Sequence, residues 1–386
     1  MRALISVLAS MFFALFPVLA FASGPTLSVD DPQACVACHG QVVSEWQESM
    51  HSRAHADSDP VFAAMRTLRM QKQGDAVAEK CAACHTPRSP TDTQSPAAKV
   101  GVSCAACHTV TEVDPSQPAR GAARLTYGDG SVFFGPHDLT EGASAVHGTS
   151  AAPPHMTDGT TLCLACHGER SNPKGAITCT TGSELPHSSD PTATCTSCHM
   201  PQVEGPTGGV TEAGATHASH AFLGPHRAWL QGDSAFLAQA VDLKASIEDS
   251  DLVVVLGNLS GHAFPTGFPG RMAVVVAKGV DAAGEPLWAV PGKDAMKQHP
   301  EAVLNKVYVD DAGSPVLPPF AAKLVRDNRL KPDEVRTLRF SLPREVTQVE
   351  VKLVYHLMPP PAVEVLGLQG TPEATPKVMR SITVTR

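Results

Sequence analysis

The sequence Cys35-Val-Ala-Cys38-His39 is the first of five copies of one pentapeptide, and these copies decide how the first half of the chain folds. The other four copies lie at residues 81–85, 104–108, 163–167 and 195–199. Each has the form CxxCH, the pattern by which c-type haem is attached. Two thiols on one helical turn can each form a thioether with a haem vinyl group, and the histidine that follows offers its imidazole to the iron. The pattern therefore predicts five covalently attached haem c groups.

The motif residues form two sets of predicted ligands. The predicted thioether residues are Cys35, Cys38, Cys81, Cys84, Cys104, Cys107, Cys163, Cys166, Cys195 and Cys198. The predicted proximal ligands are His39, His85, His108, His167 and His199. A zinc site would need CxxC pairs that share an ion, and it gives no reason for a histidine after every pair. A disulfide framework has no use for that histidine either.

The eleventh cysteine, Cys179, lies outside the motifs, 16 residues before the last one. A leftover thiol in an exported protein indicates a buried core residue, an intermolecular bridge or a reactive group. We expect Cys179 to be buried and inert.

The composition describes a globular chain that is long enough for two domains. Of 386 residues, 42% are hydrophobic and only 5% are aromatic, so we expect haem to fill part of the interior. These values exclude a membrane protein for the body of the chain. Acidic residues outnumber basic ones by 38 to 30, which gives a formal charge of -8. Because there is no basic excess to hold a polyanion, we expect no nucleic-acid partner.

The first residues have the features of an export signal. Arg2 precedes an apolar run, Ala3–Phe21, which ends in the small-x-small sequence Ala20-Phe21-Ala22. We interpret residues 1–22 as a cleaved signal peptide, so the chain is expected in the periplasm or outside the cell. The alternative is a retained membrane anchor, for which the run is barely long enough.

The apolar pattern changes near residue 231 and predicts an α+β chain with two domains. Residues 23–230 are expected to form a pentahaem domain of short helices and loops around stacked haems, with helices over 42–54 and 60–80. The uneven motif spacing of 46, 23, 59 and 32 residues argues against a tandem repeat. Residues 231–386 alternate apolar and polar side chains and are expected to form an antiparallel β-sandwich.

Twelve further histidines are available as distal ligands. The candidates are His51, His147, His217, His220 and His262, with His55 as a weaker one. His51 follows Trp46 and Ser49 on the expected helix, where His55 would share its face. His217 and His220 are spaced i, i+3, so at least one is expected to be a ligand. Gly261-His262 forms either a tight turn between strands or a loop that brings His262 to a haem. Met50, Met156 and Met200 are interpreted as packing residues.

The order of these patterns resembles a known family. WxxSxH at residues 46–51, Met200-Pro201 after the last motif, HxSHxF at 217–222 and GHAFPTG at 261–267 are similar to the multihaem cytochromes c related to the tetrahaem electron carrier of hydroxylamine oxidoreductase. The resemblance implies periplasmic electron transfer through stacked haems, with His51, His147 and one of the HxSH pair as distal ligands. This chain departs from the tetrahaem relative by its fifth motif, and some family members have a five-coordinate haem.

Two functions remain open at this point. The first is electron transfer between redox partner proteins, such as a membrane-associated quinol oxidase or a terminal reductase, in which the haems are mainly bis-histidine. An electron carrier of this kind could also form an oligomer or assemble into a longer chain of haems. The second is reduction or oxidation of a small nitrogen or sulfur compound at one five-coordinate haem, near Arg124 and Tyr127. Since all five motifs end in His rather than Lys, we expect an electron carrier, and no catalytic residue is predicted.

Overall fold

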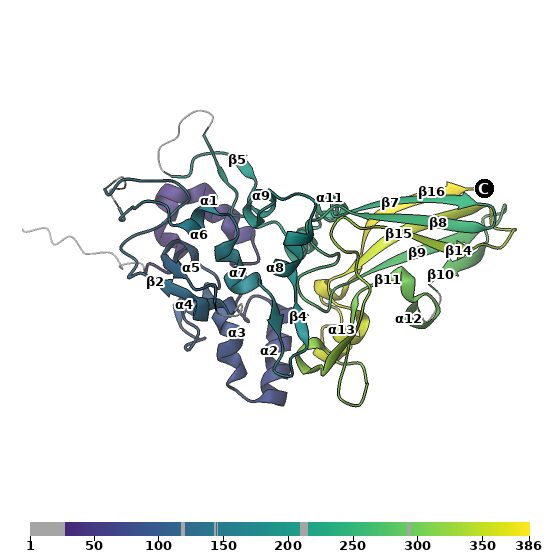
Figure 1. The fold of residues 1–386 in the computed structure, drawn as a ribbon, viewed down its shortest axis with the longest axis horizontal. Helices are drawn as coiled ribbons and strands as arrows, with labels where there is room; N and C mark the ends of the chain where they lie inside the picture. The colour runs from purple at the N-terminus through teal and green to yellow at the C-terminus, as the bar shows by residue number, and fades with distance from the viewer. Residues whose placement is uncertain (1–27, 117–119, 143, 145, 209–214, 292–294) are drawn as a thin grey trace, which may run out of the picture.

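The computed structural model describes residues 28–386 except 117–119, 143, 145, 209–214 and 292–294. The expected signal peptide lies outside the described residues. The chain is a mixed α+β protein, as expected from the sequence, and its helical part and its sheet part lie side by side (Figure 1). Within the described ranges, no helix is long and apolar enough to cross a membrane.

The first part consists of short helices joined by long connections. The helices are α1 (Val36–Glu48), α2 (Pro60–Gln73), α3 (Val77–His85), α4 (Pro96–Lys99), α5 (Cys104–His108), α6 (Pro154–Thr157), α7 (Thr161–His167), α8 (Thr181–Glu184), α9 (Cys195–His199), α10 (Pro225–Gln231) and α11 (Ser234–Ala238). Three two-stranded antiparallel pairs accompany them: β1 (Val110–Val113) with β2 (Leu125–Tyr127), β3 (Arg170–Ser171) with β4 (Ile177–Cys179), and β5 (Gln202–Glu204) with β6 (Thr216–Ala218). Short 3₁₀ helices lie at Pro32–Ala34, Gly121–Arg124 and Leu185–His187.

Two of the helices differ from the sequence-based expectation. Helix α1 ends at Glu48 rather than at residue 54, because the Ser49 hydroxyl accepts a hydrogen bond from the His51 amide at 3.2 Å and replaces the helical pairing. The helix expected over 60–80 is divided into α2 and α3. Its break is at Gly74, which adopts a φ of +85° and caps the end of α2.

The second part contains two antiparallel sheets. One has the order β14-β8-β7, from Val335–Ser341, Asp251–Asn258 and Val241–Glu248. The other has the order β10-β9-β15-β16, from Pro286–Val290, Met272–Val280, Gln348–His356 and Lys377–Thr385, and β11 (Val303–Leu304) pairs with β9. A separate hairpin joins β12 (Lys306–Val309) to β13 (Lys323–Asp327). The remaining helices are α12 (Ala295–Gln298) and α13 (Pro360–Leu366), with 3₁₀ turns at Pro300–Ala302, Pro318–Phe320 and Pro372–Ala374.

The two sheets share one hydrophobic core. Successive residues of β15 alternate between the core and the outer face, as the strand period of two requires. Leu256 of β8, Val275 of β9 and Leu353 of β15 are fully buried in the same cluster. Burying a side chain such as Leu353 contributes about 1.5–3 kcal/mol to folding.

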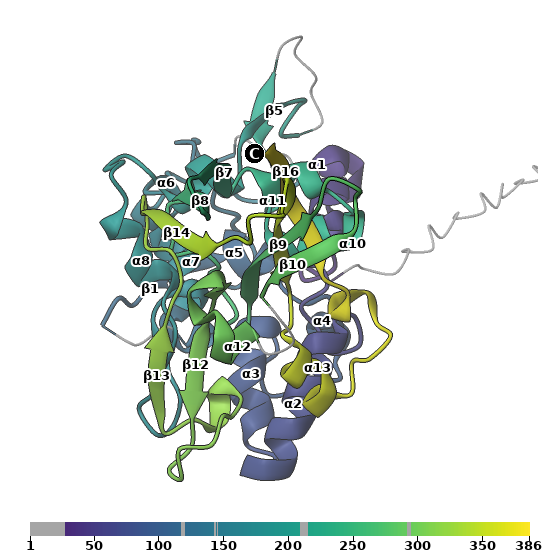
Figure 2. The same ribbon diagram turned by 90° about the vertical axis from the view of Figure 1, so that its right-hand side faces the viewer.

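A second cluster joins the two parts of the chain. Met65 of α2 packs with Val363 and Leu366 of α13, and these helices lie together in both views (Figures 1 and 2). The apolar face of α2 is therefore covered by the C-terminal part. The helical part and the sheet part pack against each other through these buried apolar side chains.

Candidate haem-binding site

The five CxxCH motifs all lie at helices. Four of them end a helix with their histidine, in α3, α5, α7 and α9, whereas His39 lies at a kink in α1 with φ -114° and ψ 35°. Helix α9 begins with a capping box in which Thr194 accepts from the Ser197 amide at 3.1 Å. In each motif both cysteines and the histidine are brought onto one turn by local structure.

Four motif histidines face a second histidine from a distant part of the chain. The ring centroids are 6.3 Å apart in His39–His147, 6.2 Å in His51–His167, 6.0 Å in His108–His220 and 6.3 Å in His199–His262. Three pairs have ring planes within 26–28° of each other, and the His51–His167 planes differ by 48°. The partner histidines are four of those that the sequence suggested.

These spacings fit two imidazoles that bind one metal ion from opposite sides. Rings stacked face to face come much closer, as the Phe62 and His85 rings do at 3.6 Å, so the nearly parallel pairs leave room between their members. A metal–imidazole bond is about 2 Å long, which places the centroids of two opposed rings about 6 Å apart. The four pairs therefore fit the axial positions of a haem iron.

Burial keeps two of the partner imidazoles in the form that binds a metal. Burial, followed by the neighbouring His167, lowers the pKa of the His51 imidazole to about 3. Burial also lowers the pKa of His220 to about 4, with His108 as the next cause. A neutral imidazole has a free lone pair, so these residues can act as ligands at any physiological pH.

Backbone carbonyl groups orient the motif histidines. The Nδ1 atom donates to a carbonyl in four of them: His39 to Thr207, His85 to Ala54 at 2.9 Å, His108 to Phe134 at 2.6 Å and His199 to Leu223 at 2.5 Å. Such a bond fixes the tautomer and leaves Nε2 as the free ligand atom, as is usual for histidines that bind a metal.

The second motif differs from the others. Among the described residues, no histidine ring faces His85, and the Phe62 ring stacks on it instead, with centroids 3.6 Å apart and planes 4° apart. Burial lowers the pKa of His85 to about 4. A small cavity adjoins this site, lined by His55, Ala56, Asp57, Phe62, Arg66, Ala82, His85, Thr86, Thr93 and Gln94.

His55 and His217 do not reach a motif histidine. His55 donates from Nε2 to the Thr93 carbonyl at 2.9 Å and accepts from the Asp57 amide at 3.1 Å. The Nδ1 of His217 lies 3.0 Å from the Gly205 carbonyl oxygen, and its Nε2 lies 3.1 Å from a Glu45 carboxylate oxygen. With oxygen partners at both nitrogens, His217 is not placed as an iron ligand.

His217 and His220 lie in different local structures, although they are only three residues apart. His217 belongs to strand β6, Thr216–Ala218, and His220 lies beyond the end of that strand. The Nδ1 of His220 bonds to the Ala218 carbonyl at 2.8 Å, and its ring faces His108.

Thiols from different motifs lie next to each other. Three pairs of thiols lie close enough to shift each other's pKa values: Cys35 with Cys104, Cys84 with Cys166, and Cys163 with Cys195. Cys107 also lies close enough to Cys163 and Cys166 to raise their pKa values, behind larger effects of hydrogen bonding and burial. These sulfurs stand for thioether sulfurs once haem is attached, so the pairs identify neighbouring motifs.

Three other candidates occupy structural positions. Cys179 lies half-buried in β4, where burial raises the pKa of its thiol and so disfavours the reactive thiolate. Arg124 donates to the backbone carbonyls of Asp114 and Leu164, at 2.9 and 3.0 Å. Tyr127 lies in β2 with the Arg88 guanidinium 4.7 Å from its ring centroid. Arg124 thus ties backbone segments together.

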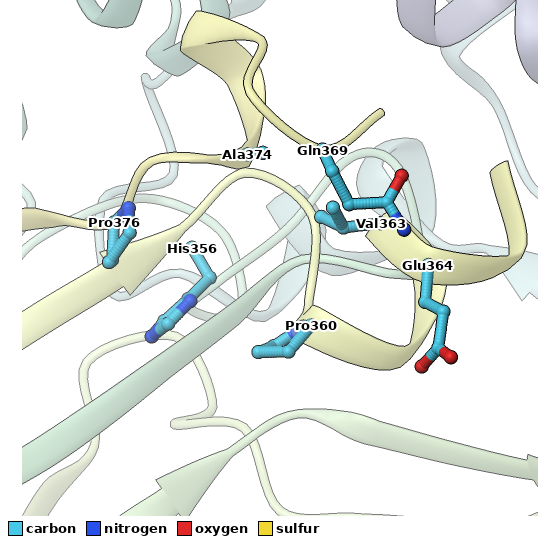
Figure 3. A pocket seen from close by; sticks show the side chains of 7 residues that line it. All are labelled: His356, Pro360, Val363, Glu364, Gln369, Ala374 and Pro376. Carbon is cyan, nitrogen blue, oxygen red and sulfur yellow. The ribbon is translucent and has the colours of Figure 1, made fainter. Parts of the chain in front are cut away.

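A hollow of about 400 Å³ lies on the sheet part beside α13. Its lining residues are His356, Pro360, Val363, Glu364, Gln369, Ala374 and Pro376 (Figure 3). No motif residue lines it, and His356 and Glu364 do not point toward one another. The hollow therefore offers no convergent set of chemical groups.

Comparisons with known proteins agree with the motif chemistry. Residues 34–109 match the family described as cytochrome c554 and c-prime. A crystal structure of a penta-heme cytochrome c552 from Thermochromatium tepidum superposes with a TM-score of 0.76 and 27% identity, over 93% of this chain and 100% of that one. None of the curated proteins matches the chain. Together with the five motifs, these likenesses show a chain that carries five covalently attached haem c groups.

Proposed function

We propose that this cytochrome carries electrons between redox partner proteins in the periplasm, through five haems of which four are held between two histidines. The observation that carries the proposal is the set of four opposed histidine pairs with centroids 6.0–6.3 Å apart. An iron with two protein ligands has no position left for a substrate, so a haem capped in this way exchanges electrons only. The apolar run at residues 3–21 supports export.

The arrangement of the motifs supports transfer from haem to haem. The thiol pairs make the first motif a neighbour of the third, and the fourth motif a neighbour of the second and the fifth. Cys107 of the third motif lies close to Cys163 and Cys166 of the fourth. Each motif thus has a cysteine next to a cysteine of another motif, and the fourth motif has three such neighbours. We infer a branched path whose ends are the haems of the first, second and fifth motifs.

A specific observation keeps the second candidate function in view. His85 has no histidine opposite it among the described residues, and a cavity with Arg66, Asp57 and His55 adjoins it. If the haem of this motif is five-coordinate, a small molecule can bind its iron. Reduction or oxidation of a small nitrogen or sulfur compound would then take place at this haem, with the other four supplying electrons.

The proposal is tested by counting open irons with carbon monoxide, which binds reduced haem only where a ligand position is free. We expect about one carbon monoxide per chain, and four low-spin haems in the oxidised protein, because four of the five motif histidines have a partner. Replacing the partner histidine in His147→Ala should raise the count by one. The control His137→Ala, which changes an exposed histidine, should leave it unchanged.

Two outcomes would contradict parts of the proposal. More than one open haem in the unmodified protein would mean that the histidine pairs are not axial ligands. No change in His147→Ala would remove the His39–His147 pair from the assignment. Catalytic consumption of hydroxylamine, nitrite or sulfite that stops when cyanide occupies the open haem would favour the enzyme over the carrier.

A further inference from the structure

The loop that carries His262 is held by two buried side chains from different parts of the chain. Glu184 ends helix α8, 17 residues after the last residue of the fourth haem motif, and is 7% exposed. Asn258 ends strand β8 and is 3% exposed. We propose that Glu184 and Asn258 are positioning residues that aim the His262 imidazole at the haem of the fifth motif. The proposal rests on the proposed ligation of that haem by His262.

Glu184 binds the segment that follows His262. Its Oε2 accepts hydrogen bonds from the Ala263 amide at 3.2 Å and from the Thr266 hydroxyl at 2.6 Å. Its Oε1 accepts from the Arg329 guanidinium at 2.7 Å and from the Thr180 hydroxyl. Both carboxylate oxygens thus accept hydrogen bonds, and both donors to Oε2 belong to the His262 loop.

Asn258 binds the segment that leads to His262. Its side-chain amide donates to the His262 carbonyl at 2.6 Å and to the Lys331 carbonyl at 2.8 Å. Its oxygen accepts from the backbone amide and the hydroxyl of Ser260, at 3.0 and 2.8 Å. A buried asparagine with all of these partners holds the turn in one conformation.

The two side chains act on the same peptide group. The carbonyl of His262 and the amide of Ala263 belong to one planar unit, of which Asn258 holds the oxygen and Glu184 holds the N–H. Fixing both ends of this plane fixes ψ of His262 and limits the directions in which its side chain can point. Backbone bonds between Phe264 and Leu330, at 2.8 and 3.0 Å, anchor the loop further.

The charge of Glu184 adds an electrostatic effect. Burial and then the neighbouring His199 lower the pKa of the His262 imidazole, and the nearby Glu184 carboxylate partly opposes them. A buried negative charge near an iron centre likewise favours the ferric state, which carries one more positive charge than the ferrous state. Removing this charge should raise the reduction potential of that haem, and loosening the ligand should act in the same direction.

The test uses the full, haem-loaded chain and four variants beside a reference. His262→Ala is the reference, and we expect it to open one further haem to carbon monoxide and to remove one low-spin signal. Glu184→Ala should open part of this same haem and raise its potential. Asn258→Asp should also open part of it, while the added negative charge opposes the rise in potential. Thr266→Val, which removes one hydroxyl with little change of shape, should act in the same direction as Glu184→Ala but less. The control Glu248→Gln breaks a 3.0 Å ion pair with Arg339, whose side chains are both about half exposed, and should change neither readout.

The outcomes separate this inference from the proposed function. If His262→Ala changes the carbon monoxide count but Glu184→Ala, Asn258→Asp and Thr266→Val leave count and potential as in the unmodified protein, the positioning role is refuted. If His262→Ala itself changes nothing, the ligation on which the role depends is wrong. If Glu184→Ala fails to accumulate, Thr266→Val tests the role of Glu184 in its place. This substitution keeps the shape of the side chain and removes only the hydrogen bond to Glu184 and the 3.2 Å contact to Thr181.

Discussion

Replacing Arg329 by methionine should destabilise the junction between the two parts of the chain. The guanidinium lies 2.7 Å from a Glu184 oxygen and 2.8 Å from an Asp327 oxygen. The side chains of Arg329 and Glu184 are each only 9% exposed, whereas Asp327 is 36% exposed and can be rehydrated. Arg329→Met therefore leaves one buried carboxylate without its countercharge. Breaking a buried pair in this way costs about 3–5 kcal/mol.

The loss of stability in Arg329→Met should become smaller as the pH falls. Burial raises the pKa of the Glu184 carboxyl, but Arg329 and the hydroxyl donors outweigh burial and lower it below the usual value. The pair therefore stabilises the unmodified protein above the pKa of an unfolded glutamate, about 4.3, and this contribution is lost as the pH falls through the lowered folded value. In Arg329→Met only the hydroxyl and amide donors still oppose burial, so the variant's carboxyl takes up a proton at higher pH than in the unmodified protein. The difference in stability is largest near pH 7 and shrinks on acidification.

The assay is guanidinium unfolding followed by circular dichroism, for the unmodified protein, Arg329→Met, Glu184→Gln and the double variant at pH 7 and pH 4. The double variant should recover at least half of the loss of Arg329→Met at pH 7, because no unpaired charge remains. A loss of equal size at both pH values, or a double variant whose loss is the sum of the two single losses, would refute this reasoning.

Three further predictions concern other buried positions. Leu353→Ala should lower the free energy of unfolding by about 2–5 kcal/mol, measured by urea unfolding, because it leaves a cavity in the core shared by both sheets. Gly121→Ala should reduce the number of attached haems found by mass spectrometry, since a Cβ there would lie 1.9 Å from the Ala83 carbonyl oxygen within the second motif, at a φ of +61°. His226→Gln should remove a pH dependence of the free energy of unfolding. Burial, then Arg271 and Arg53, lower the pKa of His226 to about 4. The Glu373 oxygen, 3.8 Å away, is too distant to offset them. Between pH 6.5 and 4 only the unfolded chain is protonated there, so the unmodified protein should lose up to about 3 kcal/mol relative to the variant, and equal slopes of stability with pH would contradict this.

The sequence predicted the haem attachment sites because their chemistry is local. Two cysteines and a histidine within five residues need only one helical turn, and no distant segment has to be known. The main strands were predictable for a similar reason, since one face of β15 is buried and its side chains alternate accordingly. The short strands β11 and β12 were not expected, because two to four residues are too few to show a period.

The histidine opposite each motif depends on packing between distant segments. Spacing could not separate His217 from His220, and the choice follows from the end of strand β6 and from the Glu45 carboxylate. The twelve histidines outside the motifs are more than five haems need, but some of them have structural roles. His155, for example, is buried and bonds through Nε2 to the Val110 carbonyl at 3.1 Å. A count of histidines therefore overestimates the number of available ligands.

The sheet part contributes one proposed ligand, and this links its folding to the state of the fifth-motif haem. His262 lies in a loop tied to β8 through Asn258 and to α8 through Glu184, so the loop has its position only when both parts are folded and packed together. A ligand that binds only the folded state stabilises that state by its binding free energy. Iron coordination by His262 would therefore stabilise the sheet part, and unfolding of the sheet part would open the haem. The two parts then form one redox unit, although the C-terminal part carries none of the five motifs.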